Sequence, residues 1–89
     1  MEALVALAKR NEGRWVKHGC GFSAMWKGGL FTLLHYGNEI LAIDAEGRRA
    51  RIGLLAYSDS DRTAINSALT LFGMNGRVGI RDGELNWVE

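Results

Sequence analysis

The sequence lacks proline and has a single cysteine, Cys20. A lone cysteine excludes an intramolecular disulfide, so a secreted fold held together by disulfides is excluded and a reducing cytoplasm fits. Without proline, the twelve glycines are the residues that must supply the turns. Low-complexity tracts and internal repeats are also lacking, which leaves one ordinary small domain, residues 1–89, with room for a single core.

Long hydrophobic runs and a strong excess of one charge are lacking as well. The apolar run at residues 3–8 has no basic segment before it and is far too short to span a bilayer, so we expect neither a signal peptide nor a membrane anchor. The net charge of +1 argues against a dedicated polyanion binder and against an acidic mimic of DNA. Residues 1–29 carry +3 and residues 30–89 carry −2, an asymmetry that chance can also produce.

The N-terminal part, residues 1–29, combines a short helix with a segment rich in glycine, aromatic and basic residues. Residues 2–10 predict the helix, with one apolar side and two basic residues where the helix dipole favours them. Residues 14–18 are compatible with a strand, but glycines at 19, 21, 28 and 29 interrupt the pattern. We therefore assign no element to residues 12–29.

Residues 30–57 predict a three-stranded antiparallel meander. A two-residue loop at Gly37-Asn38 would pair Leu34 with Leu41, and a loop at Glu46-Gly47 would pair Leu41 with Ile52. The expected core face consists of Thr32, Leu34, Leu41, Ile43, Ala50, Ile52 and Leu54. The expected second face consists of Phe31, Leu33, His35, Ile40, Ala42, Asp44, Arg49 and Arg51.

A helix over residues 59–72 follows the meander. Ser58 or Ser60 is the expected N-cap, and Ser58 with Asp61 three residues later forms a capping box with aspartate in place of glutamate. An apolar stripe at helical spacing runs from Ala64 to Phe72, and Gly73 is the expected stop.

The last element is a hairpin over residues 77–88 that turns at Asp82-Gly83. It pairs Val78 with Trp87 and places Trp87 in the core. The fold prediction is therefore α+β: a βββαββ core over residues 30–89, preceded by a short N-terminal helix.

The residues from Leu30 to Val88 resemble a class of small proteins encoded by bacteriophages. The resemblance lies in a Gly-Asn turn and in the helix-start motif Tyr57-Ser58-x-Ser60-Asp61-Arg62-x-x-Ile65-Asn66, followed by a final hairpin that ends in an aromatic-rich strand. The sequence departs from the pattern at Leu55-Ala56, where that class has two glycines. The resemblance implies a phage accessory protein and this fold, without implying an activity.

The sequence shows no recognisable set of catalytic residues, such as a nucleophile with a base or a pair of carboxylates. We therefore predict that the protein is not an enzyme and uses no cofactor. His18 and Cys20 would share one face of a strand, but no third partner is marked, so a structural cysteine is the favoured interpretation. One cysteine and two histidines fall short of the four ligands of a structural zinc site. His35 is interpreted as a packed or interface histidine.

Arg62 and Asn66 share one face of the predicted helix because they are four residues apart. They could form a polar clamp for a ligand. The favoured alternative is structural: Arg62 forms an ion pair with Asp59 or a neighbouring strand, and Asn66 fastens a turn.

Basic and aromatic residues supply the candidate partner-binding site, because cations interleaved with aromatic anchors are typical of protein hot spots and of phosphate contacts. The predicted site consists of Arg14, Trp15, Lys17, Trp26, Lys27, Arg49 and Arg51. Two structural alternatives stay open: the arginines surround a helix that covers the apolar part, and at least one tryptophan belongs to the core.

These observations favour a non-enzymatic phage accessory protein that binds and inhibits a host protein complex in the bacterial cytoplasm. A CRISPR–Cas or other anti-phage defence effector is the most concrete target. The alternative is a small nucleic-acid-binding accessory module that uses the same basic residues on phosphates and a tryptophan on a base. A homodimer formed through a strand edge is also compatible with the sequence.

Overall fold

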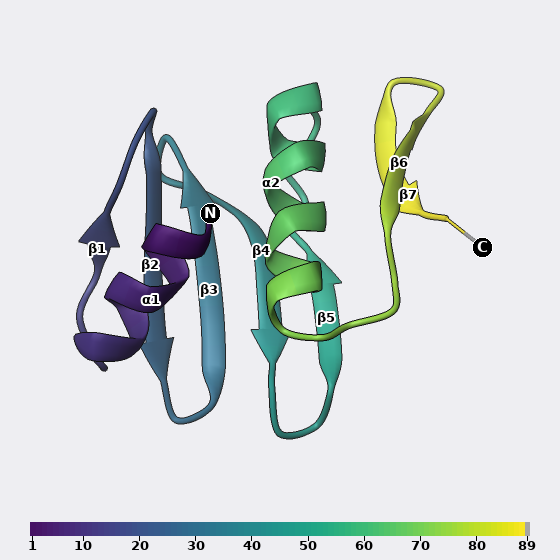
Figure 1. Cartoon of the computed structure of the whole chain (residues 1–89). Coiled ribbons are helices and arrows are strands. Elements are labelled where there is room, and N and C mark those ends of the chain that lie inside the picture. Colours follow the sequence, from purple (N-terminus) through teal and green to yellow (C-terminus); the bar gives the residue numbers. More distant parts are fainter. Residues whose placement is uncertain (89) are drawn as a thin grey trace.

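The structure, a computed structural model, describes residues 1–88. Its elements in chain order are α1 (Glu2–Arg10), β1 (Val16–Lys17), β2 (Phe22–Lys27), β3 (Leu30–His35), β4 (Asn38–Asp44), β5 (Arg49–Ile52), α2 (Asp59–Leu71), β6 (Val78–Arg81) and β7 (Glu84–Trp87) (Figure 1). The predicted α+β class, the N-terminal helix, the second helix and the final hairpin are confirmed. The main sheet has five strands, two more than the meander predicted from the sequence.

The two additional strands lie in the segment to which the sequence assigned no element. The five-stranded sheet has the order β1-β2-β3-β4-β5, and every neighbouring pair is antiparallel. Gly28 and Gly29 join β2 to β3 with φ of 59° and 82°, a conformation that glycine adopts without steric cost. The glycines that obscured this segment are therefore the turn of a hairpin.

The pairing of β4 with β5 is the predicted one, whereas the pairing of β3 with β4 is not. The turn is Tyr36-Gly37, one residue before the predicted loop, and a β-bulge shifts the register between Leu33 and Leu34. Leu33 pairs with Leu41, so Phe31 and Leu33 face the core in place of Thr32 and Leu34. Moving a two-residue loop by one position shifts the pairing by two residues and keeps the faces, whereas the bulge shifts the pairing by one residue and exchanges the two faces of β3.

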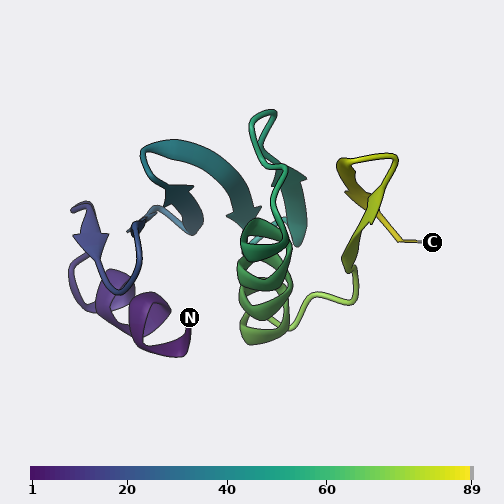
Figure 2. The ribbon, with the colours of Figure 1, turned by 90° about the horizontal axis from the view of Figure 1, so that it is seen from above.

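Both helices cover the same face of the sheet, which leaves the other face open (Figure 2). The buried cluster between the layers joins α1, α2 and the inward side chains of β2, β3 and β4. Its fully buried large members are Phe31, Leu4, Leu33, Ile40, Leu41, Ile43, Ile65 and Leu69. Burying one such side chain stabilises the fold by about 1.5–3 kcal/mol, so this cluster dominates stability.

The start of α2 is held by the capping box that the sequence predicts. Ser58 Oγ accepts a hydrogen bond from Asp61 N–H (3.1 Å), and the Asp61 carboxylate accepts from Ser58 N–H (3.3 Å). Arg62 forms an ion pair with Asp59 (2.6 Å), which confirms the structural interpretation of that residue.

The C-terminal hairpin has the predicted register and is fastened to α2 by Asn66. The Asn66 amide donates to the Val78 carbonyl (3.0 Å) and its oxygen accepts from Val78 N–H (2.8 Å), as a neighbouring strand would. Two core assignments are wrong: Trp87 is 41% exposed, and Leu54 is fully exposed because β5 ends at Ile52. Over residues 1–88, no helix is long and apolar enough to cross a membrane.

Candidate functional site

The face of the sheet opposite the helices is the candidate site, and we call it the open sheet face. Cross-strand pairing places alternate residues of each strand on it. Its members are Lys17, Ser23, Met25, Lys27, Leu30, Thr32, Leu34, Glu39, Ala42, Asp44, Arg49 and Arg51. Because no helix packs on this side, these side chains are the ones a partner would meet.

Two rows of paired residues cross this face from β2 to β5. In the first row, Lys27 pairs with Leu30, Leu30 with Asp44, and Asp44 with Arg49. In the second row, Met25, Thr32, Ala42 and Arg51 follow one another in the same order. Each row thus has one uncharged side chain on β3 and one arginine on β5. The first row also has a lysine on β2. A shallow hollow of about 370 Å³ lies over the β5 end, between Leu30, Ala42 and the two arginines.

Charges on the open sheet face are of both signs. Arg51 forms an ion pair with Glu39 (3.0 Å), and Asp44 accepts a hydrogen bond from Gly47 N–H (3.1 Å) in the β4–β5 turn. In residues 1–88, no ion pair involves Lys17, Lys27 or Arg49. Ion pairs as exposed as that of Arg51 contribute little to stability, so these cations are free to serve binding.

The structure brings together four of the seven residues that the sequence predicts for the site. Lys17, Lys27, Arg49 and Arg51 lie on the open sheet face. The two arginines do not lie beside Phe31, Leu33 and Ile40 as predicted, because those residues are buried under the helices. Their neighbours on the face are Leu30, Thr32 and Ala42.

Trp26 lies on the other side of the sheet from the four predicted residues on the open sheet face. It stacks on Phe72 of the segment after α2, with ring centroids 5.8 Å apart, and the Lys9 ammonium lies 5.2 Å from the tryptophan ring centroid. This packing confirms the alternative that one tryptophan belongs to the core layer.

Arg14 and Trp15 lie in the turn between α1 and β1, and both are exposed. Gly13 N–H donates to the Trp26 carbonyl (2.8 Å), which holds this turn against the end of β2. Arg14 and Trp15 therefore stand next to the end of the sheet and outside its two rows.

Sequence reasoning missed the uncharged part of the face, which is formed by Met25, Leu30, Thr32 and Leu34. The signal that could have identified it is the Gly28-Gly29 pair, which is a strong hairpin turn when apolar residues alternate around it. With that turn in place, Met25 falls opposite Thr32 and Lys27 opposite Leu30.

His35 and Asp61 form a partly buried pair that links the end of β3 to the start of α2. Their Nδ1 and Oδ1 atoms are 2.7 Å apart, and Asp61 is only 3% exposed. Burial raises the pKa of Asp61, but hydrogen bonds from Tyr57 N–H, His35 and Ser58 together hold the pKa of this carboxyl below its usual value. The His35 ring is stacked between Phe22 (4.1 Å between centroids) and Tyr36 (4.5 Å).

This pair is structural, as the interpretation of His35 as a packed histidine predicts. Three hydrogen bonds engage the Asp61 side chain, and aromatic rings stack on His35. The pair therefore fixes the junction of sheet and helix.

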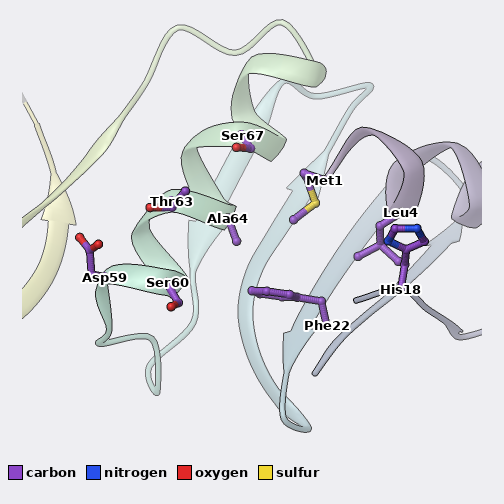
Figure 3. A pocket seen from close by; sticks show the side chains of 9 residues that line it. All are labelled: Met1, Leu4, His18, Phe22, Asp59, Ser60, Thr63, Ala64 and Ser67. Atoms are coloured by element: carbon purple, nitrogen blue, oxygen red, sulfur yellow. The ribbon is translucent and has the colours of Figure 1, made fainter. Parts of the chain in front are cut away.

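A cleft of about 360 Å³ lies between the two helices and offers a second place for a ligand (Figure 3). It is lined by apolar residues of α1 and β2 and by polar groups of α2, and His18 stands at its edge. In the described chain the hydrogen bond of His18 is donated by its backbone N–H to the Phe22 carbonyl (3.3 Å). Cys20 is exposed nearby in sequence, in the turn between β1 and β2.

Metal-binding geometry is not found among residues 1–88, where no group of three or more His, Cys, Asp or Glu side chains could hold an ion. No protein-family model, curated protein or solved structure matches the chain. The assignment of a function therefore depends on the geometry of the open sheet face.

Proposed function

We propose that this protein is a non-enzymatic binding protein that docks on a protein partner through its open sheet face. The partner, by the resemblance to phage accessory proteins, is a host protein complex in the bacterial cytoplasm. The most concrete target is a CRISPR–Cas or other anti-phage defence effector, which docking would inhibit by covering a surface that the effector needs.

The observation that carries this proposal is the composition of one uncovered face. Leu30 and Thr32 on β3 are uncharged and lie between β2, which carries Met25 and Lys27, and β5, which carries the two arginines. An apolar centre with a charged rim is the usual anatomy of a protein interface, and arginine is enriched there.

The area of the face indicates how far the interface extends. The five strands are two to seven residues long, and at about 3.3 Å per residue and about 4.8 Å between strands they give a projected area of roughly 400 Å². A standard interface buries about 800 Å² per partner. The contact would therefore also include neighbouring exposed residues, and Arg14 and Trp15 beside β1 are suited to this role.

Nucleic acid is the weaker alternative for the same face. The four cations outnumber the two carboxylates, which favours a polyanion, but Glu39 and Asp44 stand among the arginines. No residue of the open sheet face is aromatic, so base stacking there has no platform. A protein partner of mixed charge fits this arrangement better.

Charge reversal at β5 tests the proposal. Replacing Arg49 and Arg51 together by glutamate should weaken partner binding roughly tenfold or more. The free energy of unfolding should fall by about 1 kcal/mol, because both side chains are exposed but the new carboxylates would face Asp44 and Glu39 on β4. Binding is measured by titration of the captured partner, and stability by urea unfolding. A matched control, Arg10→Glu with Arg81→Glu, changes the net charge equally on residues outside the face. Equal binding by the β5 variant and the control would remove the arginines from the site.

A further inference from the structure

A groove of about 690 Å³ separates β5 from β7, and we call it the β5–β7 groove. Residues 50–54, 56 and 57 line one side, and residues 83–87 line the other. It lies at the end of the sheet where the C-terminal hairpin stands beside α2, away from α1 (Figure 1). The groove is a second surface that adjoins the open sheet face at β5, where Ala50 and Arg51 line both, and its opposite wall is the hairpin.

β5 presents free backbone groups to this groove. Gly53 N–H donates to the Ile40 carbonyl (2.8 Å), so hydrogen-bonded pairs alternate along β5 at Gly53, Arg51 and Arg49. The N–H and C=O groups of Ala50 and Ile52 therefore point away from β4. Among residues 1–88, no other strand pairs with β5, and no backbone hydrogen bond from elsewhere reaches these two residues.

β7 is an edge strand by the same reasoning. Val88 N–H donates to the Arg77 carbonyl (2.9 Å), so the backbone groups of Leu85 and Trp87 point away from β6. The opposite edge of the hairpin differs, because Asn66 satisfies both backbone groups of Val78. Among residues 1–88, Asn66 thus satisfies Val78 on the hairpin edge that faces α2, whereas the two strands that border the groove have no such partner.

Large apolar side chains surround the groove and remain exposed. Leu54 is fully exposed, Tyr57 is 72% exposed and Trp87 is 41% exposed, although all three line the groove. Exposed apolar groups gathered beside an unpaired strand edge mark an interaction site or an aggregation hazard. β5 is four residues long and carries two arginines but no lysine or proline.

We infer that the β5–β7 groove binds an extended peptide segment of a partner protein, which adds to β5 as a sixth strand. The complementarity is between partial charges: two N–H donors and two C=O acceptors on β5 match the alternating groups of an extended backbone. Leu54, Tyr57 and Trp87 would receive its apolar side chains. The hairpin limits the space beside β5, and a single extended peptide fits such a space. A folded second copy would bring its own hairpin and helices to the same edge.

Selection from a library of random linear dodecapeptides displayed on phage, panned on the immobilised full chain, provides the probe. The enriched peptide, capped at both ends, is then titrated into ¹⁵N-labelled protein. We expect alternating apolar residues in the enriched sequences, and slower hydrogen exchange at the Ala50 and Ile52 amides when the peptide is bound. N-methylation of alternate peptide amides should weaken binding roughly tenfold or more, because it removes backbone donors without removing side chains.

Two variants separate this site from the open sheet face. Leu54→Asp should weaken peptide binding roughly tenfold, whereas Leu30→Asp, which places the same charge on the open sheet face, should leave it unchanged. Failure of panning to enrich any sequence, an insensitivity to N-methylation, or peptide-induced changes confined to the open sheet face would each overturn the inference. Protection of the Ala50 and Ile52 amides that rises with protein concentration and without peptide would show instead that a second copy occupies the edge.

Discussion

Replacing Gly53 by alanine should lower the free energy of unfolding by about 3 kcal/mol. Gly53 is buried at the end of β5, where an added methyl group would overlap the carbonyl oxygen of Glu39 and lie 2.6 Å from its carbonyl carbon and 2.9 Å from Ile40 Cα. These are backbone atoms at the bulge of β4, and they cannot rotate away as a side chain can. A domain of this length has a total stability of roughly 4–13 kcal/mol, so the loss would be a large part of it.

Gly53→Ala should also disturb the proposed binding surfaces, in addition to lowering the stability of the whole domain. Relief of the overlap requires that β5 move away from β4, and β5 carries Arg49 and Arg51 and borders the groove. Urea unfolding followed by tryptophan fluorescence measures the loss. Gly79→Ala is the matched control, because in β6 the added methyl group would meet only a Val88 methyl carbon at 3.0 Å. Equal stability of the two variants would contradict the close approach of Gly53 to β4.

Removing the Asp61 carboxylate should destabilise the protein by about 3 kcal/mol. Asp61→Ala leaves the backbone N–H groups of Tyr57 and Ser58 and the Nδ1 of His35 without their acceptor in a partly buried region. It also abolishes the capping box of α2. Thermal unfolding of this variant, compared with Ser58→Ala, which removes only the cap hydroxyl, separates the contribution of the carboxylate. We expect the loss at Ser58 to be about 1 kcal/mol.

The same carboxylate gives the folded state a defined dependence on pH. The pKa of Asp61 is lower in the folded protein than in the unfolded chain. Its contribution to stability is therefore fully present above the unfolded value, about 3.9, and is lost as the pH falls through the folded value. Asp61→Asn keeps the shape of the side chain but removes this titration. Its free energy of unfolding should fall less steeply than that of the natural protein below pH 4, and parallel curves would contradict the assignment.

Local signals predicted much of this fold correctly. The capping box at Ser58 and Asp61, the Asp82-Gly83 turn and the β4–β5 pairing each depend on residues close together in sequence, where turn chemistry and side-chain alternation decide the outcome. The structural roles of Arg62 and His35 followed in the same way.

The errors arose where two registers were equally compatible with the sequence. Both faces of β3 carry apolar residues, namely Leu30 and Leu34 on one and Phe31 and Leu33 on the other, so alternation could not show which face is buried. The bulge beside Leu33 has no sequence signal of its own. The candidate site was found only in part for a related reason: its uncharged centre lies on β2 and β3, whose pairing depends on the Gly28-Gly29 turn that was not recognised.

An affinity pull-down from a lysate of a bacterial host most directly tests the claim that the protein binds a protein partner. Tagged protein is washed at low and at high salt, with and without nuclease, beside the Arg49→Glu and Arg51→Glu double variant. The account predicts one protein partner in near-stoichiometric amount that survives both treatments and is lost from the variant, because an interface with an apolar centre depends little on salt. Nucleic acid retained alone and released as the salt concentration rises would contradict it, since that is the behaviour of phosphate neutralisation.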